Sequence, residues 1–219
     1  MSDVSVATRP QRNSGELTSA IGGGVEAVTV VDHQLELAGA VLTGGASRRM
    51  GETKALIEID GVPMASLVAQ ALREAGGDPV VLVGGNGDQL ASLAMTVIPD
   101  GHAGEGPLAG VISALTHFAQ VADHVLIAAC DLADLTGDDL LPLVAETNRR
   151  QDLDVVVART DQIEPACAVW NTGSLDQLLV MFADGERALH AAIGQLRAAT
   201  VPVGASAMRN INSPADLDR

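Results

Sequence analysis

The chain has 219 residues, of which 47% are hydrophobic, and a formal net charge of -15. This length accommodates one large domain, or one domain with an extension, and the apolar fraction is ample for a buried core. The acidic balance excludes binding to a nucleic-acid backbone, which needs many Lys and Arg, and two Phe, one Trp and no Tyr offer few platforms for stacked bases. The partners that remain are small molecules and proteins.

Two cysteines and the N-terminus bear on the cellular compartment. Cys130 and Cys167 lie far apart in apolar runs, without the spacing of a zinc site or of a disulfide scaffold. We therefore expect two buried, reduced thiols in a cytoplasmic protein. No segment reaches the roughly 18 uninterrupted apolar residues of a membrane span. The N-terminus also lacks the apolar core of a secretory signal, so no membrane association is expected.

The predicted elements begin after a polar, glycine-containing segment. Residues 1–36 are weakly periodic and are interpreted as a flexible N-terminal extension, followed by a domain at 37–219. The domain opens with a β-loop-α-β pattern. LAGAVL at 37–42 predicts a buried strand, MASLVAQALREAG at 64–76 a helix, and PVVLVGG at 79–85 a second strand.

The same alternation continues to the C-terminus. Further strands are predicted at 95–100, 124–131, 154–159, 163–170 and 200–203, and helices at 106–119, 137–150, 172–182, 186–196 and from a cap at Ser213. Continuous apolar strands separated by helices indicate a mostly parallel sheet covered on both faces, a three-layer α/β/α fold. Because such sheets bind ligands at the carboxyl ends of their strands, the loops after Leu42, Val83, Ile98 and Cys130 should converge on one crevice.

The stretch VLTGGASRRMGETK at 41–54 has the chemistry of an anion site. Gly44 and Gly45 follow a strand directly, where backbone N–H groups can approach a phosphate. Lys54 is the only lysine of the chain, against twelve arginines, and a lysine can bind a phosphate oxygen as a point charge. One of Arg48 and Arg49 is expected on the phosphates too. The spacing fits neither a P-loop nor the Rossmann glycine fingerprint.

The segment LTGGASRRMGETKA resembles the signature L-x-G-G-x-S-x-R-M-G-x-x-K-A of the molybdenum cofactor guanylyltransferase family, a MobA-like group of nucleotidyltransferases. Other pieces follow in the family's order: VIPD at 97–100, GPLAGVISAL at 106–115, the strand ending in Cys130-Asp131, EPACAVW at 164–170 and NINSPADL at 210–217. The resemblance covers about residues 37–217 and implies a nucleotide-diphospho-sugar transferase fold, which is Rossmann-like.

The resemblance also implies a reaction: GMP is transferred from GTP to molybdopterin, with pyrophosphate released. GTP would contact Leu42, Thr43, Gly44, Gly45, Lys54 and Asp100, the last at the guanine or ribose. Asp131 would hold Mg2+, and Arg49, Lys54 and Asp131 would be the catalytic residues. Molybdoenzymes or other cofactor-biosynthesis proteins are the implied protein partners.

The position of Asp131 agrees with this role, because a carboxylate just past an apolar strand can hold a hard cation that keeps waters and substrate phosphates as its other ligands. The alternative is a helix cap, for which Thr136 or Asp134 would also serve. Two positions depart from the family. Ala133 replaces the proline of Cys-Asp-x-Pro, which would loosen the loop and let Asp134 join or misplace the metal, and Thr43 stands where Ala is usual.

Two other functions remain open. Cytidylyl transfer to molybdopterin, or transfer to another small phosphate, would need only a few different loop contacts to the base. A nucleotide-binding partner of a molybdoenzyme without catalytic activity would agree with the altered CDLAD loop. The retention of Lys54, Asp100 and Asp131 argues against that second alternative.

Overall fold

The computed structural model describes residues 36–44, 53–211 and 216 of the chain. Within them, one seven-stranded sheet has the order β5-β4-β1-β6-β8-β7-β9, and β2 and β3 form a separate hairpin. The strands are β1 (Leu37–Leu42), β2 (Glu58–Ile59), β3 (Val62–Pro63), β4 (Val80–Val83), β5 (Val97–Ile98), β6 (His124–Ala129), β7 (Val155–Arg159), β8 (Ile163–Asn171) and β9 (Ala198–Pro202).

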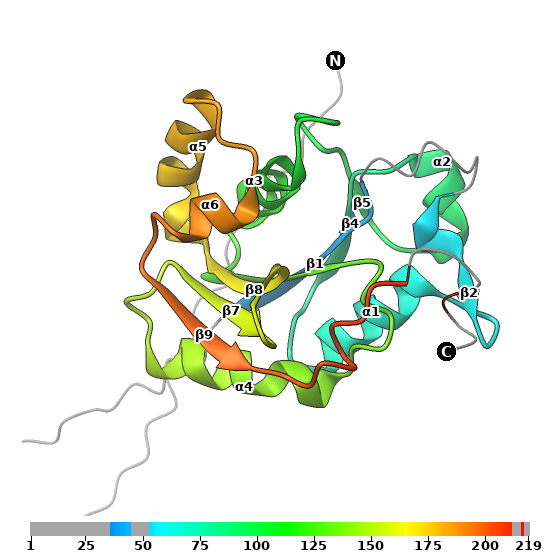
Figure 1. Cartoon of the computed structure of the whole chain (residues 1–219). Coiled ribbons are helices and arrows are strands. Elements are labelled where there is room, and N and C mark those ends of the chain that lie inside the picture. Colours follow the sequence, from blue (N-terminus) through cyan, green and yellow to red (C-terminus); the bar gives the residue numbers. More distant parts are fainter. Residues whose placement is uncertain (1–35, 45–52, 212–215, 217–219) are drawn as a thin grey trace, which may run out of the picture. The chain divides into compact units, whose positions relative to one another are not determined.

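Helices cover both faces of this sheet. They are α1 (Met64–Glu74), α2 (Gly87–Leu90), α3 (Pro107–Phe118), α4 (Gly137–Arg149), α5 (Leu175–Ala183) and α6 (Leu189–Ile193), with short 3-10 helices η2 (Lys54–Leu56), η3 (Ala91–Leu93) and η4 (Thr172–Ser174). Figure 1 shows α1 and α4 on one face and α3, α5 and α6 on the other. The predicted three-layer α/β/α architecture is therefore confirmed.

The sheet is mostly parallel, as predicted. β1 pairs in parallel with β4 and β6, β4 with β5, and β7 with β9. Only β8 runs antiparallel to its two neighbours among these seven strands. The parallel strands β5, β4, β1 and β6 bring their carboxyl ends to the same edge of the sheet.

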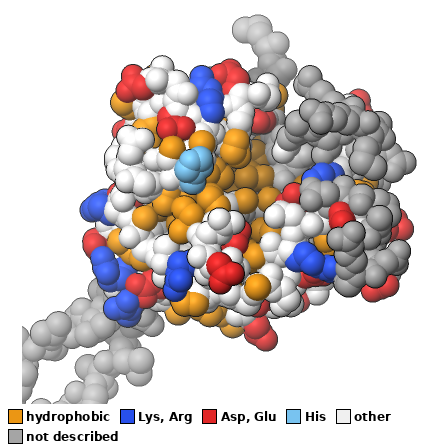
Figure 2. All heavy atoms as spheres, in the orientation of Figure 1, with side chains coloured by type: hydrophobic (Ala, Val, Ile, Leu, Met, Phe, Trp, Pro, Cys, Tyr) orange, Lys and Arg blue, Asp and Glu red, His pale blue; other side chains and the backbone are white. Residues whose placement is uncertain are grey.

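Alternate residues of each strand supply the two halves of the core. On β6, Leu126 packs into a cluster with α1 and α4, whereas the next residue, Ile127, packs into a cluster with α3, α5 and α6. Trp170 of β8 is fully buried in the second cluster. In the space-filling view, hydrophobic side chains gather at the centre of the visible face and charged ones lie mainly toward its rim (Figure 2).

Two helix starts follow local rules. Gly106 precedes α3 with a φ of 99°, a conformation that favours glycine, and Pro107 occupies the first helical position, where no N–H is needed. α4 begins with a capping box: the Thr136 side chain accepts from the Asp139 N–H, and the Asp139 carboxylate accepts from the Thr136 N–H. Thr136 is thus the cap of α4, and Asp131 does not have that role.

Several elements of the structure are shorter than the strands and helices that we predicted from the apolar runs, notably β5 and α6. The helix predicted from Ser213 and the N-terminal extension, apart from its last residue, lie outside the described residues. Cys130 and Cys167 are buried, as predicted. None of the described helices has the length and apolar character needed to cross a membrane.

Candidate active site

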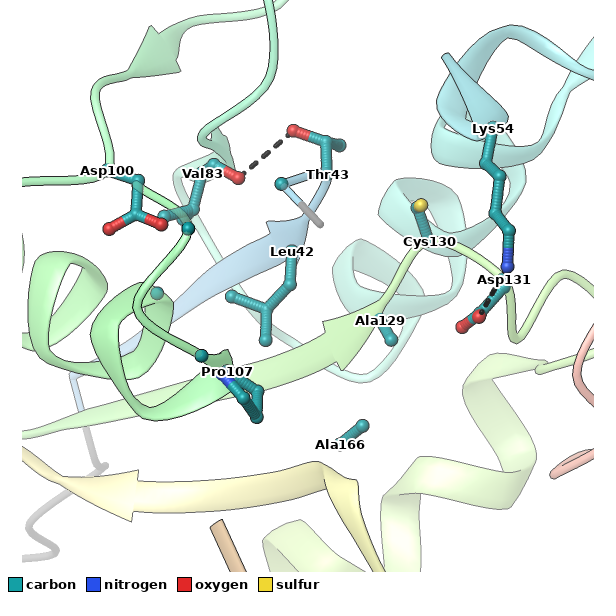
Figure 3. Close-up of a pocket in the computed structure, with 14 residues that line it drawn as sticks. Leu42, Thr43, Lys54, Val83, Asp100, Pro107, Ala129, Cys130, Asp131 and Ala166 are labelled. Carbon is teal, nitrogen blue, oxygen red and sulfur yellow. Dashed lines mark hydrogen bonds and ion pairs between the residues drawn. The ribbon is translucent and has the colours of Figure 1, made fainter. Parts of the chain in front are cut away.

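A cavity of about 260 Å³ lies at the carboxyl edge of the parallel strands. Leu42, Val83 and Cys130, at or just after the ends of β1, β4 and β6, line it together with Asp100, which follows β5. The four loops that we expected to converge therefore do so. Figure 3 shows their side chains around the cavity, with Pro107 at the start of α3 and Ala166 of β8 below them.

Glycines allow these loops to approach closely. A Cβ atom on Gly84 would lie 3.2 Å from the Gly44 Cα and 3.3 Å from the Asp100 Cβ, tighter than nearly all real contacts of this kind. Gly84 also has a φ of 75°, which favours glycine. The loops after β1, β4 and β5 thus form one packed wall that leaves little room for a side chain at this point.

At one end of the cavity, Lys54 and Asp131 form an ion pair. The Lys54 Nζ lies 3.5 Å from the Asp131 Oδ2, and the two side chains are 26% and 22% exposed. Lys54 begins η2, whereas Asp131 follows β6, so the sheet brings together two residues that are 77 positions apart. Lys54, from the predicted anion-binding stretch 41–54, and Asp131, the predicted metal ligand, therefore lie side by side at the cavity, as Figure 3 shows.

Asp100 lies at the other end. Its Oδ1 accepts a hydrogen bond from the His102 N–H at 3.1 Å and another from the Ser113 Oγ at 3.4 Å. In Figure 3, Leu42 and Thr43 lie between Asp100 and the Lys54–Asp131 pair. The two carboxylates are thus placed to contact different parts of a ligand.

The acidic side chains at the cavity decide whether it fits the Mg2+ that the resemblance implies. Among the described residues, no three His, Cys, Asp or Glu side chains converge in a way that could hold a metal ion. Mg2+ typically binds through one or two carboxylates and takes its other ligands from water and substrate phosphates. Asp131, half-buried at the cavity beside Lys54, is an oxygen donor of that kind, so the residues present fit Mg2+ delivered with a phosphorylated ligand.

The end of β1 corrects one expectation about the glycine pair. The Gly44 N–H donates to the Val83 carbonyl at 3.1 Å and is therefore engaged within the fold rather than directed at an anion. The Thr43 N–H donates to the same carbonyl at 3.0 Å. Gly45, Arg48 and Arg49 lie outside the described residues, so their expected contacts with phosphate stay predictions.

The departures at Thr43 and Ala133 have visible consequences. The Thr43 hydroxyl lies 3.1 Å from the Val83 carbonyl and 2.9 Å from the Gly84 carbonyl, and so links the loops after β1 and β4. Asp134, which we expected to join or misplace the metal, forms an ion pair with Arg209 at 2.8 Å. Sequence reasoning missed both contacts, because each joins residues far apart in the chain.

Cys130 also lines the cavity, but it is a poor nucleophile. Burial, reinforced by the charge of Asp131, raises the pKa of its thiol to about 12. The thiolate is the nucleophilic form and the metal-binding form of cysteine, and its population is negligible near neutrality. We therefore do not assign Cys130 a role as a nucleophile or a metal ligand.

Fold and site together define an α/β domain with a cavity at the carboxyl edge of a parallel sheet, the place where nucleotides bind in this class of fold. The family model of the MobA-like NTP transferase domain matches residues 39–201. The chain belongs to this family, and so to the nucleotidyltransferases.

Individual relatives match over most of their length. A probable molybdenum cofactor guanylyltransferase of Opitutus terrae is 32% identical over 191 residues, 84% of this chain and 94% of the relative. The molybdenum cofactor guanylyltransferase of Rhodobacter capsulatus is 28% identical over 188 residues, 84% and 95% of the two chains. The crystal structure of molybdopterin-guanine dinucleotide biosynthesis protein A from Archaeoglobus fulgidus superposes with a TM-score of 0.66 at 26% identity, covering 83% and 95% of the chains. The predicted nucleotide-diphospho-sugar transferase fold is confirmed.

Proposed function

We propose that this chain transfers GMP from GTP to molybdopterin, forming the guanine dinucleotide cofactor and releasing pyrophosphate. The names of the relatives from Opitutus terrae and Rhodobacter capsulatus support the substrates. The observation in the molecule that carries the proposal is the Lys54–Asp131 pair at the cavity, 3.5 Å apart. It combines a cation for phosphate with a carboxylate for a metal at the expected edge of the sheet.

In this proposal each residue contacts a defined part of the nucleotide. Lys54 binds phosphate oxygens, and Arg49 assists it. Asp100, separated from this pair, contacts the guanine or the ribose, while the loop of residues 42–45 borders the nucleotide. Asp131 would hold Mg2+, which would offset negative charge on the phosphates when bound.

The reaction needs no general base. The terminal phosphate of molybdopterin is largely ionised near neutrality, since the second pKa of such a group is about 6. One of its oxygens attacks the α-phosphorus of GTP, and the bond from that phosphorus to the bridging oxygen breaks. The electron pair of this bond leaves with pyrophosphate. The Lys54 ammonium offsets the charge that develops on the phosphates, an electrostatic contribution to the rate.

The product would be used by molybdoenzymes or handed on by other cofactor-biosynthesis proteins, and we propose both as partners of the chain. This reaction would take place in the cytoplasm.

Nucleotide binding tests the proposal directly. Calorimetry in the presence of Mg2+ should show that the wild type binds GTP in preference to CTP and ATP. Lys54→Ala should weaken GTP binding about 10- to 100-fold, because a charge-assisted contact to phosphate contributes about 1.5–3 kcal/mol. Arg73→Ala, which removes an exposed cation on α1, is the matched control and should bind GTP like the wild type.

The alternatives predict different results. Preference for CTP would make the chain a cytidylyltransferase. GTP binding without Mg2+-dependent pyrophosphate release in the presence of molybdopterin would indicate a nucleotide-binding partner without catalytic activity. Absence of binding to any nucleotide would refute the proposal.

A further inference from the structure

The loop after β6 is tied to the C-terminal segment at two points. The first is Asp134, whose Oδ2 lies 2.8 Å from both the Nε and the Nη2 of Arg209. Arg209 and Asp134 are 75 positions apart, and their side chains are 39% and 33% exposed. Arg209 also donates from Nη1 to the Asp216 carbonyl at 3.0 Å. A single guanidinium therefore links the loop to the end of the chain.

The second point is Asp131 itself. The Ile211 N–H donates to the Asp131 carbonyl at 2.9 Å. The Ile211 side chain is fully buried and packs in a small cluster with Met64 and Ala133. Residues 207–211, which we call the C-terminal strap, thus hold the backbone of the predicted metal ligand and the side chain three positions later.

The loop between these points is short and closely packed. Leu132, Ala133 and Leu135 are at most 8% exposed, and the Leu132 and Leu135 N–H groups donate to the Ala129 and Leu132 carbonyls. Because this segment is packed so closely, we expect a displacement of Asp134 to shift Asp131, and with it the orientation of the Asp131 carboxylate toward the cavity.

We propose that Arg209 is a positioning residue, which sets the orientation of the Asp131 carboxylate toward the metal by fixing Asp134. This inference rests on the proposed function, in which Asp131 holds the cation. Groups that orient a ligand without contacting the metal typically change metal affinity about 10- to 100-fold when they are removed. The ion pair supplies, from a distant part of the chain, the restraint that a proline at position 133 would supply locally.

The direction in which removal of Arg209 changes the cation affinity distinguishes a positioning role from a purely electrostatic one. Arg209 is a cation of the C-terminal strap that pairs with the loop carrying the metal ligand, so electrostatics alone predict tighter cation binding when it is removed. Positioning predicts the opposite, because a misoriented Asp131 binds the cation less well. A purely structural role would lower stability without a selective effect on the metal.

The experiment measures Mn2+ binding, by the paramagnetic resonance signal of the free ion, in the presence of GTP. Arg209→Met should raise the Mn2+ dissociation constant about 10-fold or more. Arg209→Lys, which keeps one charged contact to Asp134, should recover part of the loss. Arg149→Met is the matched control, since Arg149 pairs with Glu146 on the surface of α4, and it should bind Mn2+ like the wild type.

Hydrogen-deuterium exchange of residues 131–135 provides a second measurement. The amides of this loop should exchange faster in Arg209→Met, while those of β1 and β4 stay protected. Should Arg209→Met fail to fold, Asp134→Asn breaks the same ion pair and should show the same faster exchange. Equal or tighter Mn2+ binding by a folded Arg209→Met, or unchanged exchange in the variant that folds, would overturn the inference. Failure of the wild type to bind Mn2+ with GTP would overturn the proposed function of Asp131 as well.

Discussion

At the scale of single residues, Thr43 shows how much one hydroxyl contributes to the site. It is 7% exposed, and its Oγ1 lies within hydrogen-bond distance of the Val83 and Gly84 carbonyls. An ideal Cβ on Gly85 would lie only 3.3 Å from this oxygen. The hydroxyl therefore holds the turn after β4 against the end of β1, beside the cavity.

Thr43→Val keeps the shape of this side chain and removes the hydroxyl. The buried Gly84 carbonyl then loses its donor, so the free energy of unfolding in urea should fall by about 1–3 kcal/mol. GTP affinity should fall with it, because the turn after β4 loosens. Thr43→Ser retains the hydroxyl and should lose less of both. Equal stability of Thr43→Val and the wild type would contradict this account of Thr43.

His124, at the start of β6, is a polar side chain whose burial costs folding free energy. It is 4% exposed, and neither ring nitrogen has a hydrogen-bond partner in the part of the chain that the structure describes. Burial lowers the pKa of His124 below its ordinary value of 6.5, and the nearby charge of Asp123 partly opposes the shift. The folded protein therefore holds this imidazole neutral at neutral pH.

The pH dependence of stability follows from that shift. Below about pH 6.5 the unfolded chain binds a proton at this histidine that the folded chain does not yet bind. The contribution to stability is thus complete above pH 6.5 and decreases as the pH falls toward the lowered folded pKa. Urea unfolding of His124→Leu should show a weaker loss of stability between pH 7.5 and 5 than the wild type. Parallel curves for the two proteins would mean that other groups cause the acid sensitivity.

At the scale of elements, local sequence patterns located the strands of the seven-stranded sheet and the helices that cover it, but not β2, β3 or α2, and not the direction of every strand. Buried parallel strands are continuous apolar runs, which is why LAGAVL and PVVLVGG were recognised as β1 and β4. β8 runs antiparallel to β7. Three residues, 160–162, connect them, and a parallel connection needs a crossover of a dozen or more. The short connection between β7 and β8 is therefore enough to predict that β8 runs antiparallel to β7.

The loop 131–135 shows what local patterns cannot predict. Replacement of a proline by Ala133 indicated a loosened loop with Asp134 near the metal. In the structure Asp134 is held by Arg209, and the Asp131 carbonyl by the Ile211 N–H. Nothing in the sequence around position 133 records these contacts, because both partners come from the C-terminal strap.

At the scale of the whole molecule, we propose that the nucleotidyltransferase domain spans 37–219 and that residues 1–36 form an extension. The family model begins at residue 39, which supports a start near β1. Glu36 contributes its carbonyl to the fold, since it accepts from the N–H groups of Asp123 and His124 at 2.9 and 3.2 Å. A shortened chain should therefore retain Glu36.

A chain that begins at Glu36 should melt within a few degrees of the full chain and bind GTP with the same affinity. A chain that begins at Gly39 is the matched comparison, because it lacks the Glu36 carbonyl and the buried Leu37 and Ala38 of β1. It should melt at a clearly lower temperature, as measured by calorimetry. A large loss in the chain that begins at Glu36 would show that the extension belongs to the domain.

The sequence by itself determined the order along the chain of the strands in the seven-stranded sheet and of the helices that cover it, the mostly parallel sheet and the edge at which the cavity forms. These features depend on periodicity and on turn residues, which are properties of neighbouring positions. Only the tertiary structure decided which charged side chains meet: Lys54 with Asp131, and Arg209 with Asp134. Such pairs arise from the spatial order of the strands and the path of the C-terminal strap. Their energy depends on distances between residues far apart in the chain, which no local pattern encodes.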